Sequence, residues 1–343
     1  MKILVTGGTG FIGSHTVVEL QKQKFEVLIA DNLSNSSIDV LDNIAGITGV
    51  LPDFEKVDLS EREATAGLFN RHPDIKAIIH FAASKSVGES VDFPLKYYRN
   101  NLNSLINILE EMTKHEIHDI VFSSSCTVYG QADELPVRET TPIKPAWSPY
   151  GNTKQICEEI IRDNGRVSKI QASMLRYFNP IGAHESALIG ELPLGVPNNL
   201  IPYITQTAIG IRDYLRVWGD DYNTPDGTAI RDYIHVVDLA EAHIAAINRL
   251  LDGKNEVPVE VFNLGTGKGY SVLEVIHSFE KMSGVKLKYK IQNRRPGDIE
   301  KVWADTTRAN KVLGWVAKRG LDDMTLSAWN WEKHLAELKN KGK

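Results

Sequence analysis

Short apolar runs alternate with stretches of helical periodicity over the first half of the chain. The apolar runs indicate strands at residues 2–6, 26–31, 54–57, 77–80, 119–124 and 172–178. The periodic stretches predict helices at residues 12–24, 60–70, 93–114 and 149–164, and Ser60 with Glu63 has the spacing of a capping box for the second helix. Strands that alternate with helices favour right-handed βαβ units. We therefore expect an α/β fold with a parallel, doubly wound sheet of the Rossmann type.

The pattern changes beyond residue 178. Residues 179–199 are rich in glycine and proline, and residues 220–228 form a second polar stretch that contains both. Helical patterns follow at 200–210, 237–251, 271–282 and 321–338, and residues 259–264 predict a late strand that could rejoin the main sheet. We expect a cofactor domain over residues 1–178, rejoined by about residues 236–264, and a smaller α/β substrate domain over residues 179–343.

Composition narrows the class of protein. Charged residues are 24% and hydrophobic residues 42% of 343, which is typical of soluble globular proteins. The net charge of -5 provides no basic surface for nucleic acid. Cys126 and Cys157 are too few for a disulfide framework and are better explained as small buried residues than as reactive thiols. With no signal peptide after Met1 and no apolar stretch near the ~20 residues of a membrane span, we expect a cytoplasmic protein.

A glycine-rich turn joins the first strand to the first helix. Gly7, Gly10 and Gly13 satisfy Gly-x-x-Gly-x-x-Gly around Phe11 and Ile12. Glycine at these positions permits a tight turn and close approach of a pyrophosphate, and a helix N-terminus attracts phosphate groups. The sequence therefore predicts a dinucleotide site here, although an ordinary glycine-rich turn would look the same.

An acidic residue indicates which dinucleotide binds. Asp31 ends the second strand, 18 residues after Gly13, where its carboxylate would accept hydrogen bonds from the adenosine ribose. No Arg or Lys lies between Asp31 and Lys56 to hold a 2′-phosphate, which favours NAD over NADP. Asp58 would meet the adenine edge or, alternatively, begin a helix. Further candidates near the adenosine and the fourth strand are Asn32, Leu59, Phe81, Ala82 and Ala83.

Tyr150 and Lys154 are candidates for acid–base chemistry. They are four residues apart after Pro149, which can start a helix, so both side chains rise from one helical face. An ammonium close to a phenol stabilises the phenolate and makes it a general base. Ser125 follows the strand 119–124, whose carboxyl end faces the ligand crevice of a doubly wound sheet. Ser125, Tyr150 and Lys154 can therefore converge beside a nicotinamide.

Several blocks of sequence resemble the extended short-chain dehydrogenase/reductase family, and more narrowly its nucleotide-sugar 4-epimerases. The resemblance runs from Val5-Thr6-Gly7-Gly8 to Trp303-Ala304-Asp305. Its specific parts are Ser123-Ser124-Ser125-Cys126-Thr127-Val128-Tyr129-Gly130, Ser148-Pro149-Tyr150-Gly151, Arg176-Tyr177-Phe178-Asn179-Pro180, Pro197-Asn198-Asn199-Leu200, Asp226-Gly227-Thr228, Arg231-Asp232-Tyr233-Ile234-His235 and Arg294-Arg295-Pro296-Gly297-Asp298.

The resemblance implies NAD-dependent interconversion of UDP-glucose and UDP-galactose through a transient 4-keto intermediate, as in galactose metabolism. Tyr150 would take the proton from the sugar 4-hydroxyl while a hydride leaves C4, and Ser125 would bridge the proton and hold the 4-keto oxygen. A free tyrosine has a pKa near 10, so work at neutral pH needs a lowering of ~3 units. We expect Lys154 to supply most of this lowering and the positive nicotinamide the rest.

The resemblance also assigns further residues. Lys85, Asn100, Tyr177 and Phe178 match positions near the cofactor. The expected UDP-hexose ligands are Asn179, Asn199, Leu200, Trp218, Arg231, Arg295 and Asp298. Val302 falls where relatives carry a bulkier or a smaller residue beside the hexose 2-substituent, which predicts some tolerance for UDP-GlcNAc and UDP-GalNAc. A homodimer through residues 93–114 and 149–164 is implied, no metal ion is expected, and Cys126 and Arg216 receive no role.

Other functions remain open from the sequence. A 4,6-dehydratase needs an acid–base pair, usually Asp-Glu, after the position of Ser125, but Cys126-Thr127 stands there and counts against elimination. A UDP-glucuronate decarboxylase is not excluded. A regulator that binds NAD without chemistry often loses the tyrosine or the lysine, whereas this chain keeps both along with Ser125.

Overall fold

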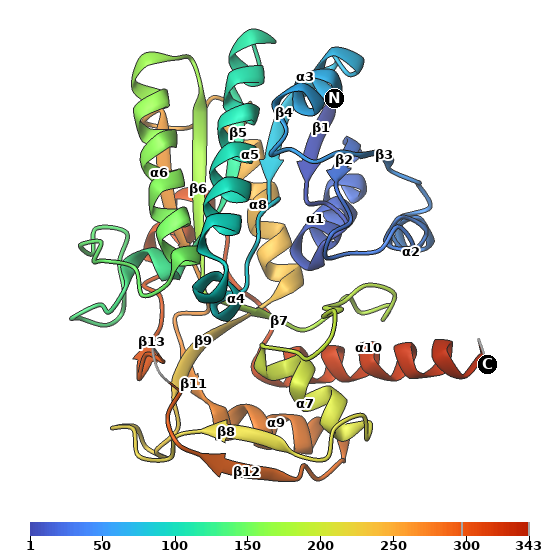
Figure 1. The fold of residues 1–343 in the computed structure, drawn as a ribbon, viewed down its shortest axis with the longest axis vertical. Helices are drawn as coiled ribbons and strands as arrows, with labels where there is room; N and C mark the ends of the chain where they lie inside the picture. Colours follow the sequence, from blue (N-terminus) through green and yellow to red (C-terminus); the bar gives the residue numbers. More distant parts are fainter. Residues whose placement is uncertain (296–297, 342–343) are drawn as a thin grey trace.

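The computed structural model describes residues 1–295 and 298–341, and within them its largest layer is a seven-stranded parallel sheet (Figure 1). The strand order is β10-β6-β5-β4-β1-β2-β3. The strands are β1 (Lys2–Thr6), β2 (Glu26–Asp31), β3 (Asp53–Lys56), β4 (Ile75–His80), β5 (Asp119–Ser125), β6 (Gln171–Tyr177) and β10 (Val259–Leu264). The order reverses between β1 and β4, and ligands bind at such a switch point in open α/β sheets. The predicted doubly wound fold is confirmed.

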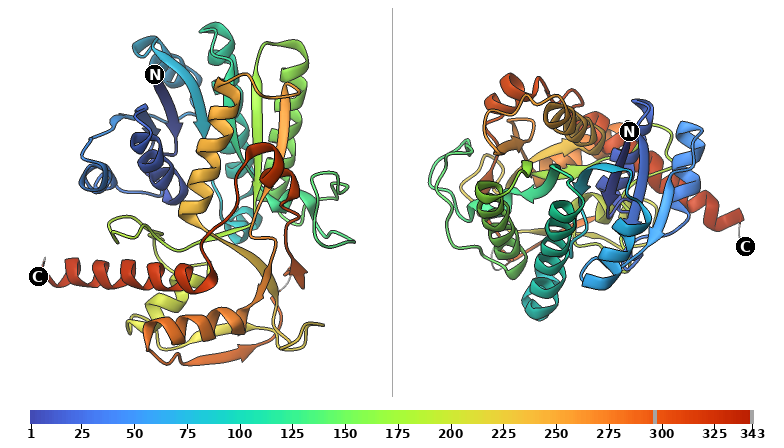
Figure 2. Two further views of the ribbon diagram at one scale, coloured as in Figure 1. Left: turned by 180° about the vertical axis from the view of Figure 1, so that it is seen from behind. Right: turned by 90° about the horizontal axis from the view of Figure 1, so that it is seen from above.

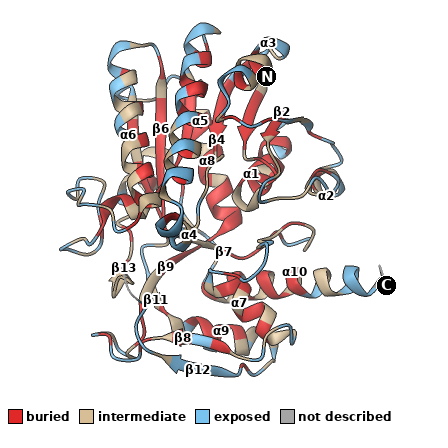
Figure 3. Cartoon of the chain, viewed as in Figure 1, coloured by how far each residue is buried: buried red, intermediate tan, exposed pale blue. Residues whose placement is uncertain are grey.

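Helices cover both faces of this sheet (Figure 2). One face carries α1 (Phe11–Lys22), α2 (Val40–Thr48) and α8 (Val236–Leu251), and the other carries α3 (Arg62–Arg71), α5 (Pro94–Lys114) and α6 (Pro149–Val167). Successive strand residues point to opposite faces, so Ile3 and Val5 pack under the first group while Leu4 packs under the second. The strands are therefore almost continuously apolar, and Figure 3 shows them buried.

A smaller α/β unit lies beyond the carboxyl ends of the main strands (Figure 1). Its strands are β7 (Asn179–Ile181), β8 (Leu215–Trp218), β9 (Ile230–His235), β11 (Gly269–Ser271), β12 (Tyr289–Gln292) and β13 (Lys301–Val302), and its helices are α7 (Leu200–Ala208), α9 (Val272–Ser283) and α10 (Leu321–Lys341). β9 pairs with β7, β11 and β13, while β8 pairs with β12. A separate apolar cluster that includes Ile204, Val217, Phe279 and Met324 holds this unit together.

The chain passes between the two units more than once. β9 leads directly into α8, which returns to the main sheet, and β10 pairs with β6 before β11 pairs with β9. Three short elements complete the described fold. They are α4 (Val87–Asp92), the 3₁₀ helix η1 (Cys126–Tyr129) and the π-helix η2 (Ala309–Leu313). Among the described residues, no helix combines the length and the apolar character that a membrane crossing needs.

Predicted and observed element ends differ by at most three residues, but one capping prediction is wrong. The helix α3 begins at Arg62, and Ser60 instead donates its amide at 2.9 Å and its hydroxyl at 2.7 Å to Asp58 Oδ1. The aspartate thus forms a local turn that competes with helix initiation. A capping box does occur at α9, where Ser271 and Glu274 bond reciprocally.

Candidate active site

The glycine turn packs against the end of β4. Gly7 has φ +68°, and a Cβ there would lie 2.8 Å from the amide nitrogen of Ala82. A Cβ on Gly13 would lie 2.3 Å from the carbonyl oxygen of Gly7, so α1 sits against the turn more closely than any side chain allows. Gly10 precedes α1 without a side-chain cap. The first amides of α1 therefore remain available to a phosphate.

Asp31 is tied to this turn. One carboxylate oxygen accepts from the Leu33 amide at 2.9 Å and the Ser36 hydroxyl at 3.4 Å, and the other accepts from the Thr9 amide at 3.3 Å. Nearby, Asn32 donates to Asp58 at 3.5 Å. Both acidic candidates for the adenosine end thus lie at one edge of the sheet, and the Asp31 carboxylate keeps acceptor capacity for further donors.

The ends of β3 and β4 place the other cofactor candidates. The amides of Phe81 and Ala82 donate to Thr6, at 3.0 Å to its carbonyl and 3.3 Å to its hydroxyl. Leu59 is buried in the core on the α5 side of the sheet, and Ala83 follows Ala82 into the loop before α4. Asn100 donates to the Ser84 hydroxyl at 3.2 Å. Phe81 and Ala82 therefore border the switch point between β1 and β4.

A carboxylate that the sequence reasoning missed joins the two units. Glu191 Oε1 accepts from Asn199 at 2.6 Å and from Lys85 at 3.5 Å. Lys85 follows β4, whereas Asn199 stands directly before Leu200 at the start of α7. No spacing rule connects residues 85, 191 and 199, so only the folded chain shows that one oxygen links a cofactor candidate with a substrate candidate.

The catalytic candidates meet at the carboxyl end of β5. Ser125 is its last residue, and its hydroxyl accepts from the Thr127 amide at 3.2 Å. Tyr150 lies in the first turn of α6, which Ser148 caps by accepting from the Gly151 amide at 3.1 Å. One turn later, Lys154 donates to the carbonyl oxygen of Ser123 at 2.6 Å, with its ammonium 6.0 Å from the centre of the Tyr150 ring.

Two aromatic residues enclose this group. The Lys154 ammonium lies 4.8 Å from the centre of the Phe122 ring, and the Tyr177 hydroxyl hydrogen-bonds the Ser123 hydroxyl. Phe178, the next residue, is buried, and its amide donates to Leu264 at 3.1 Å. Burial raises the pKa of Tyr177 well above its usual range, so this second phenol stays protonated.

The ionisation of Tyr150 differs from the sequence expectation. Burial raises the pKa of Tyr150 to about 12, and the opposing influence comes from a hydrogen bond with Ser125 and not from Lys154. Burial also lowers the pKa of Lys154 to about 8, against smaller raising effects of Cys157 and Glu158. The expectation that Lys154 supplies most of the lowering is therefore wrong for the protein groups alone, because its ammonium is drawn to the Ser123 carbonyl while the phenol is desolvated.

The substrate candidates lie in the smaller unit. Asn179 is in β7, and Trp218 ends β8. Arg231, in β9, donates to the carbonyl oxygen of Ile230 at 2.9 Å and lies near enough to Cys126 to lower the pKa of that thiol. The Arg295 guanidinium donates to the Asp298 carboxylate at 2.9 Å. The two residues predicted to bind UDP separately thus bind each other, which sequence spacing did not indicate.

Val302 borders the same region. It is buried, pairs in register with Arg231 across β13 and β9, and packs in a cluster with Val128 and Phe178.

Burial raises the pKa of Cys126 to about 12 and that of Cys157 to about 11, so neither thiol is a thiolate at neutral pH. This supports the interpretation of both cysteines as small, unreactive residues.

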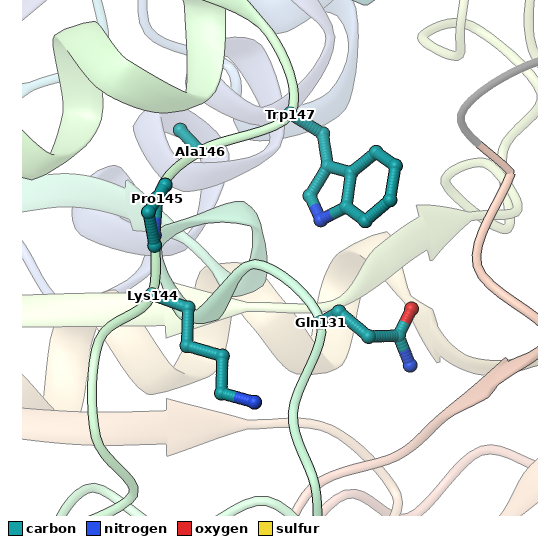
Figure 4. A pocket seen from close by; sticks show the side chains of 5 residues that line it. All are labelled: Gln131, Lys144, Pro145, Ala146 and Trp147. Carbon is teal, nitrogen blue, oxygen red and sulfur yellow. The ribbon is translucent and has the colours of Figure 1, made fainter.

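A surface pocket lies beside the start of α6 (Figure 4). It has a volume of about 350 Å³ and is lined by Gln131, Lys144, Pro145, Ala146 and Trp147. Trp147 directly precedes the capping Ser148 and is 63% exposed. A second pocket of about 310 Å³ lies between α1, α8 and the segment 314–318. None of the predicted site residues lines either pocket.

The residues of the main sheet fit NAD. The turn packs tightly against β4 and α1 only because Gly7 and Gly13 lack side chains, as in a dinucleotide-binding turn, and Asp31 offers a carboxylate at the end of β2 for a ribose. In the described residues, no group of three or more His, Cys, Asp or Glu side chains could hold a metal ion. Fold and site together define a Rossmann-fold, NAD-dependent enzyme that carries a further, smaller α/β unit.

Known proteins share this arrangement over almost the whole chain. The family model described as GDP-mannose 4,6 dehydratase matches residues 4–327. The UDP-glucose 4-epimerase of Bacillus subtilis is 50% identical over 333 residues, with 97% of each chain covered. That of Mus musculus is 48% identical over 339 residues, covering 97% of this chain and 96% of the relative. The chain belongs to the UDP-glucose 4-epimerase family.

Solved structures agree with this placement. The UDP-glucose 4-epimerase of Stenotrophomonas maltophila, solved with NAD and formylated UDP-arabinopyranose, has a TM-score of 0.95 and 46% identity, covering 98% of this chain and 99% of its own. The enzyme from Bifidobacterium longum, solved with NAD+ and UDP, has a TM-score of 0.92 and 46% identity, covering 97% of this chain and 98% of its own. The prediction of NAD as cofactor is confirmed.

Proposed function

We propose that this protein interconverts UDP-glucose and UDP-galactose with NAD as its cofactor, and so serves galactose metabolism. The observation that carries the proposal is the meeting of Ser125, Tyr150 and Lys154 at the carboxyl end of β5, next to the switch point of the sheet. The family membership supplies the substrate class, because relatives at about half identity over nearly full length are UDP-glucose 4-epimerases.

The proposed mechanism assigns each residue a task. Bound NAD supplies the hydride acceptor and a positive charge close to the phenol. Tyr150 takes the proton from the sugar 4-hydroxyl and returns it when the 4-ketone is reduced on its opposite face. Ser125 donates to the 4-oxygen, and Lys154 holds its charge at the end of β5. Because burial raises the pKa of Tyr150 to about 12 in the protein groups alone, the mechanism requires that a bound cofactor's positive charge lower it.

Epimerisation also requires the hexose to turn over while UDP stays bound. We infer that Asn179, Asn199 and Arg231 hold the nucleotide part, with Leu200 and Trp218 as apolar neighbours. Arg295 and Asp298 would exchange their mutual 2.9 Å bond for contacts with UDP. A carboxylate that releases an arginine to a phosphate keeps the guanidinium oriented beforehand, which favours a two-point contact with the diphosphate.

The competing activities can be separated by product. Elimination would need an acid–base pair after Ser125, where Cys126 is present with a thiol pKa of about 12 and cannot serve as a base near neutral pH. Decarboxylation of UDP-glucuronate remains the second candidate within the fold. Incubation with UDP-galactose and no added cofactor should yield UDP-glucose of unchanged mass and no net NADH. Loss of water from UDP-galactose, or no reaction with it, would refute the proposal, and release of carbon dioxide from UDP-glucuronate in a parallel incubation would favour the decarboxylase instead.

Assembly and location are finer proposals. We infer a homodimer through α5 and α6, because α5 carries Leu95 and Ile106 with 78% and 38% of their surface exposed. A partner that covers this face would bury apolar surface. Sedimentation at micromolar concentration should give twice the chain mass of 38.3 kDa. A cytoplasmic location is consistent with two unpaired cysteines.

A further inference from the structure

A buried carboxylate lies directly behind the catalytic group. Glu158 follows Lys154 by one turn of α6, and its side chain is inaccessible to solvent. It accepts from the Ser124 hydroxyl at 2.6 Å, from Arg176 at 2.8 and 2.5 Å through two nitrogens, and from Arg162 at 2.7 Å. The network therefore joins β5, β6 and α6 through a single side chain.

The partners of Glu158 border the reacting residues. Ser124 lies between Ser123, whose carbonyl accepts from Lys154, and the catalytic candidate Ser125. Arg176 stands opposite Ser124 in the β5–β6 register, and its guanidinium stacks 4.7 Å from the centre of the Tyr129 ring in η1. A buried carboxylate is tolerated only when it is fully hydrogen-bonded, so this network holds a single arrangement.

We propose that Glu158 is a positioning residue for the proposed epimerisation: it fixes α6 against the end of β5 and places a buried negative charge one helical turn from Lys154. The inference rests on the proposed function for its catalytic consequence, but not for the network itself. Glu158 was not singled out by the sequence, because its partners Ser124 and Arg176 are 34 and 18 residues away.

The surroundings of Lys154 make the electrostatic effect specific. The titratable groups around Lys154 are Tyr150, Cys157 and Glu158 on α6 and His80 on β4. On β6, Tyr177 acts on Tyr150, and Arg176 is paired with Glu158. Burial lowers the pKa of His80 to about 3 and raises that of Cys157 to about 11, so neither changes charge between these limits. Between about pH 3 and pH 11, the pH dependence of kcat therefore reports mainly on the ionisation of Tyr150 and Lys154.

The sign of the effect follows from the charge. Glu158 raises the pKa of Lys154 against the lowering by burial, so its neutralisation lowers the pKa of the ammonium further. A more positive surrounding also lowers the pKa of the Tyr150 phenol. Activity rises as the phenol ionises and falls as the ammonium loses its proton, so both limbs of a pH–rate profile should move to lower pH.

The test is Glu158→Gln, which keeps the shape of the side chain and removes its charge. We expect both limbs of the kcat profile to move to acid by about 1 pH unit. A purely structural role would lower the height of the profile without moving its limbs. The matched control is Arg162→Gln, which removes a half-buried partner of the same carboxylate and should leave both limbs within about 0.2 pH unit. Unmoved limbs in a folded Glu158→Gln protein would overturn the proposal.

Folding is controlled by a second variant. Glu158→Gln leaves the Arg176 guanidinium buried without its counter-charge, whereas Glu158→Gln with Arg176→Met removes both charges and is often tolerated. We expect the acid shift to persist in the double variant. A return of both limbs to the wild-type position would show that Glu158 only neutralises Arg176, and would refute its action on Lys154.

A second readout does not depend on turnover. Ultraviolet difference absorbance of the NAD-containing protein follows tyrosine ionisation, and Tyr150→Phe identifies the transition of this phenol. We expect Glu158→Gln to move that transition to lower pH. If the wild type fails to epimerise UDP-galactose, the proposed function fails while this titration still tests Glu158. An unchanged Tyr150 transition in Glu158→Gln would sink the inference even where the enzyme is active.

Discussion

Lys154 donates a 2.6 Å hydrogen bond to the backbone carbonyl oxygen of Ser123, at the end of the strand that carries Ser125. This bond places the ammonium between the strand and the first turn of α6, and not directly on the phenol of Tyr150. The protein therefore maintains a buried cation one helical turn from the proposed general base, and burial of this charge makes the native state less stable.

Lys154→Met should abolish activity and stabilise the fold. Burial lowers the pKa of Lys154 from 10.5 to about 8, which corresponds to roughly 3 kcal/mol of destabilisation at neutral pH. We expect a loss of at least about 100-fold in kcat and a higher urea midpoint at pH 7. A lower midpoint would mean that the hydrogen bond to Ser123 outweighs the burial of charge.

The same lysine predicts a pH dependence of stability. Its folded pKa lies below its unfolded pKa, so between about pH 8 and 10.5 the unfolded chain binds more protons than the folded chain. The destabilisation is complete below pH 8 and fades as the pH rises through that window. The difference in unfolding free energy between Lys154→Met and wild type should therefore shrink from pH 7 to pH 10. A constant difference would contradict the assignment.

Tyr150→Phe should separate chemistry from cofactor binding. The change removes a hydroxyl but keeps the ring in the first turn of α6. We expect kcat to fall by roughly 1,000-fold or more, while the NAD content of the purified protein stays near that of wild type. Ser148→Ala is a useful comparison, because it removes the cap of α6 and should lower stability by about 1 kcal/mol with a smaller loss of rate.

Asp31→Ala should weaken NAD retention. The carboxylate accepts from Thr9, Leu33 and Ser36, so its loss also loosens the glycine turn. Removal of hydrogen bonds to a charged group predicts about 10- to 100-fold weaker binding of NAD, measured by calorimetry on protein stripped of cofactor. Asp58→Asn, at the same edge of the sheet, should weaken NAD binding less. Equal effects would contradict a direct ribose contact of Asp31.

Gly13→Ala should damage the cofactor turn through sterics alone. The new Cβ would lie 2.3 Å from the Gly7 carbonyl oxygen, so α1 must move away from the turn. We expect a loss of several kcal/mol in unfolding free energy and no retained NAD. The matched control is Gly88→Ala in α4, where no atom lies within 4 Å of the added Cβ and stability should rise slightly.

Val302→Tyr should shift substrate preference. Val302 is buried beside Arg231, and a tyrosine there would reduce the space that we propose for the hexose. We expect the ratio of kcat/KM for UDP-GalNAc to that for UDP-galactose to fall by at least about tenfold. Equal ratios in wild type and variant would dismiss Val302 as a determinant of the 2-substituent.

The periodic parts of the fold were predictable, whereas its long-range polar contacts were not. The strands β1–β6 and the long helices follow from runs of apolar residues such as Ile3, Leu4 and Val5, which burial on both faces of a parallel sheet requires. The strands β7, β8 and β12 and the helices α2 and α4 were not predicted, although α2 is as long as the predicted α7 and β8 as long as the predicted β3. Their formation depends on neighbours far away in the sequence.

The candidate site shows the same division. Motif spacing identified Gly7, Asp31 and Tyr150, because each acts through local backbone geometry. It could not show that Glu191 joins Lys85 to Asn199, or that Lys154 turns toward Ser123, since these contacts form between separate elements. The pKa of Tyr150 was misjudged for a related reason: desolvation depends on the whole fold, whereas the sequence showed one nearby charge.

The late return of the chain to the main sheet restricts how this protein can be divided. A fragment that stops at residue 178 would lack β10 and α8. β6 would then become an unpaired edge strand, and the apolar face of the sheet that Leu239 and Ile247 of α8 cover would be exposed to water. An edge strand with unpaired backbone N–H and C=O groups beside exposed apolar side chains promotes aggregation. The nucleotide-binding half can therefore be obtained alone only if residues 236–264 are grafted back onto it.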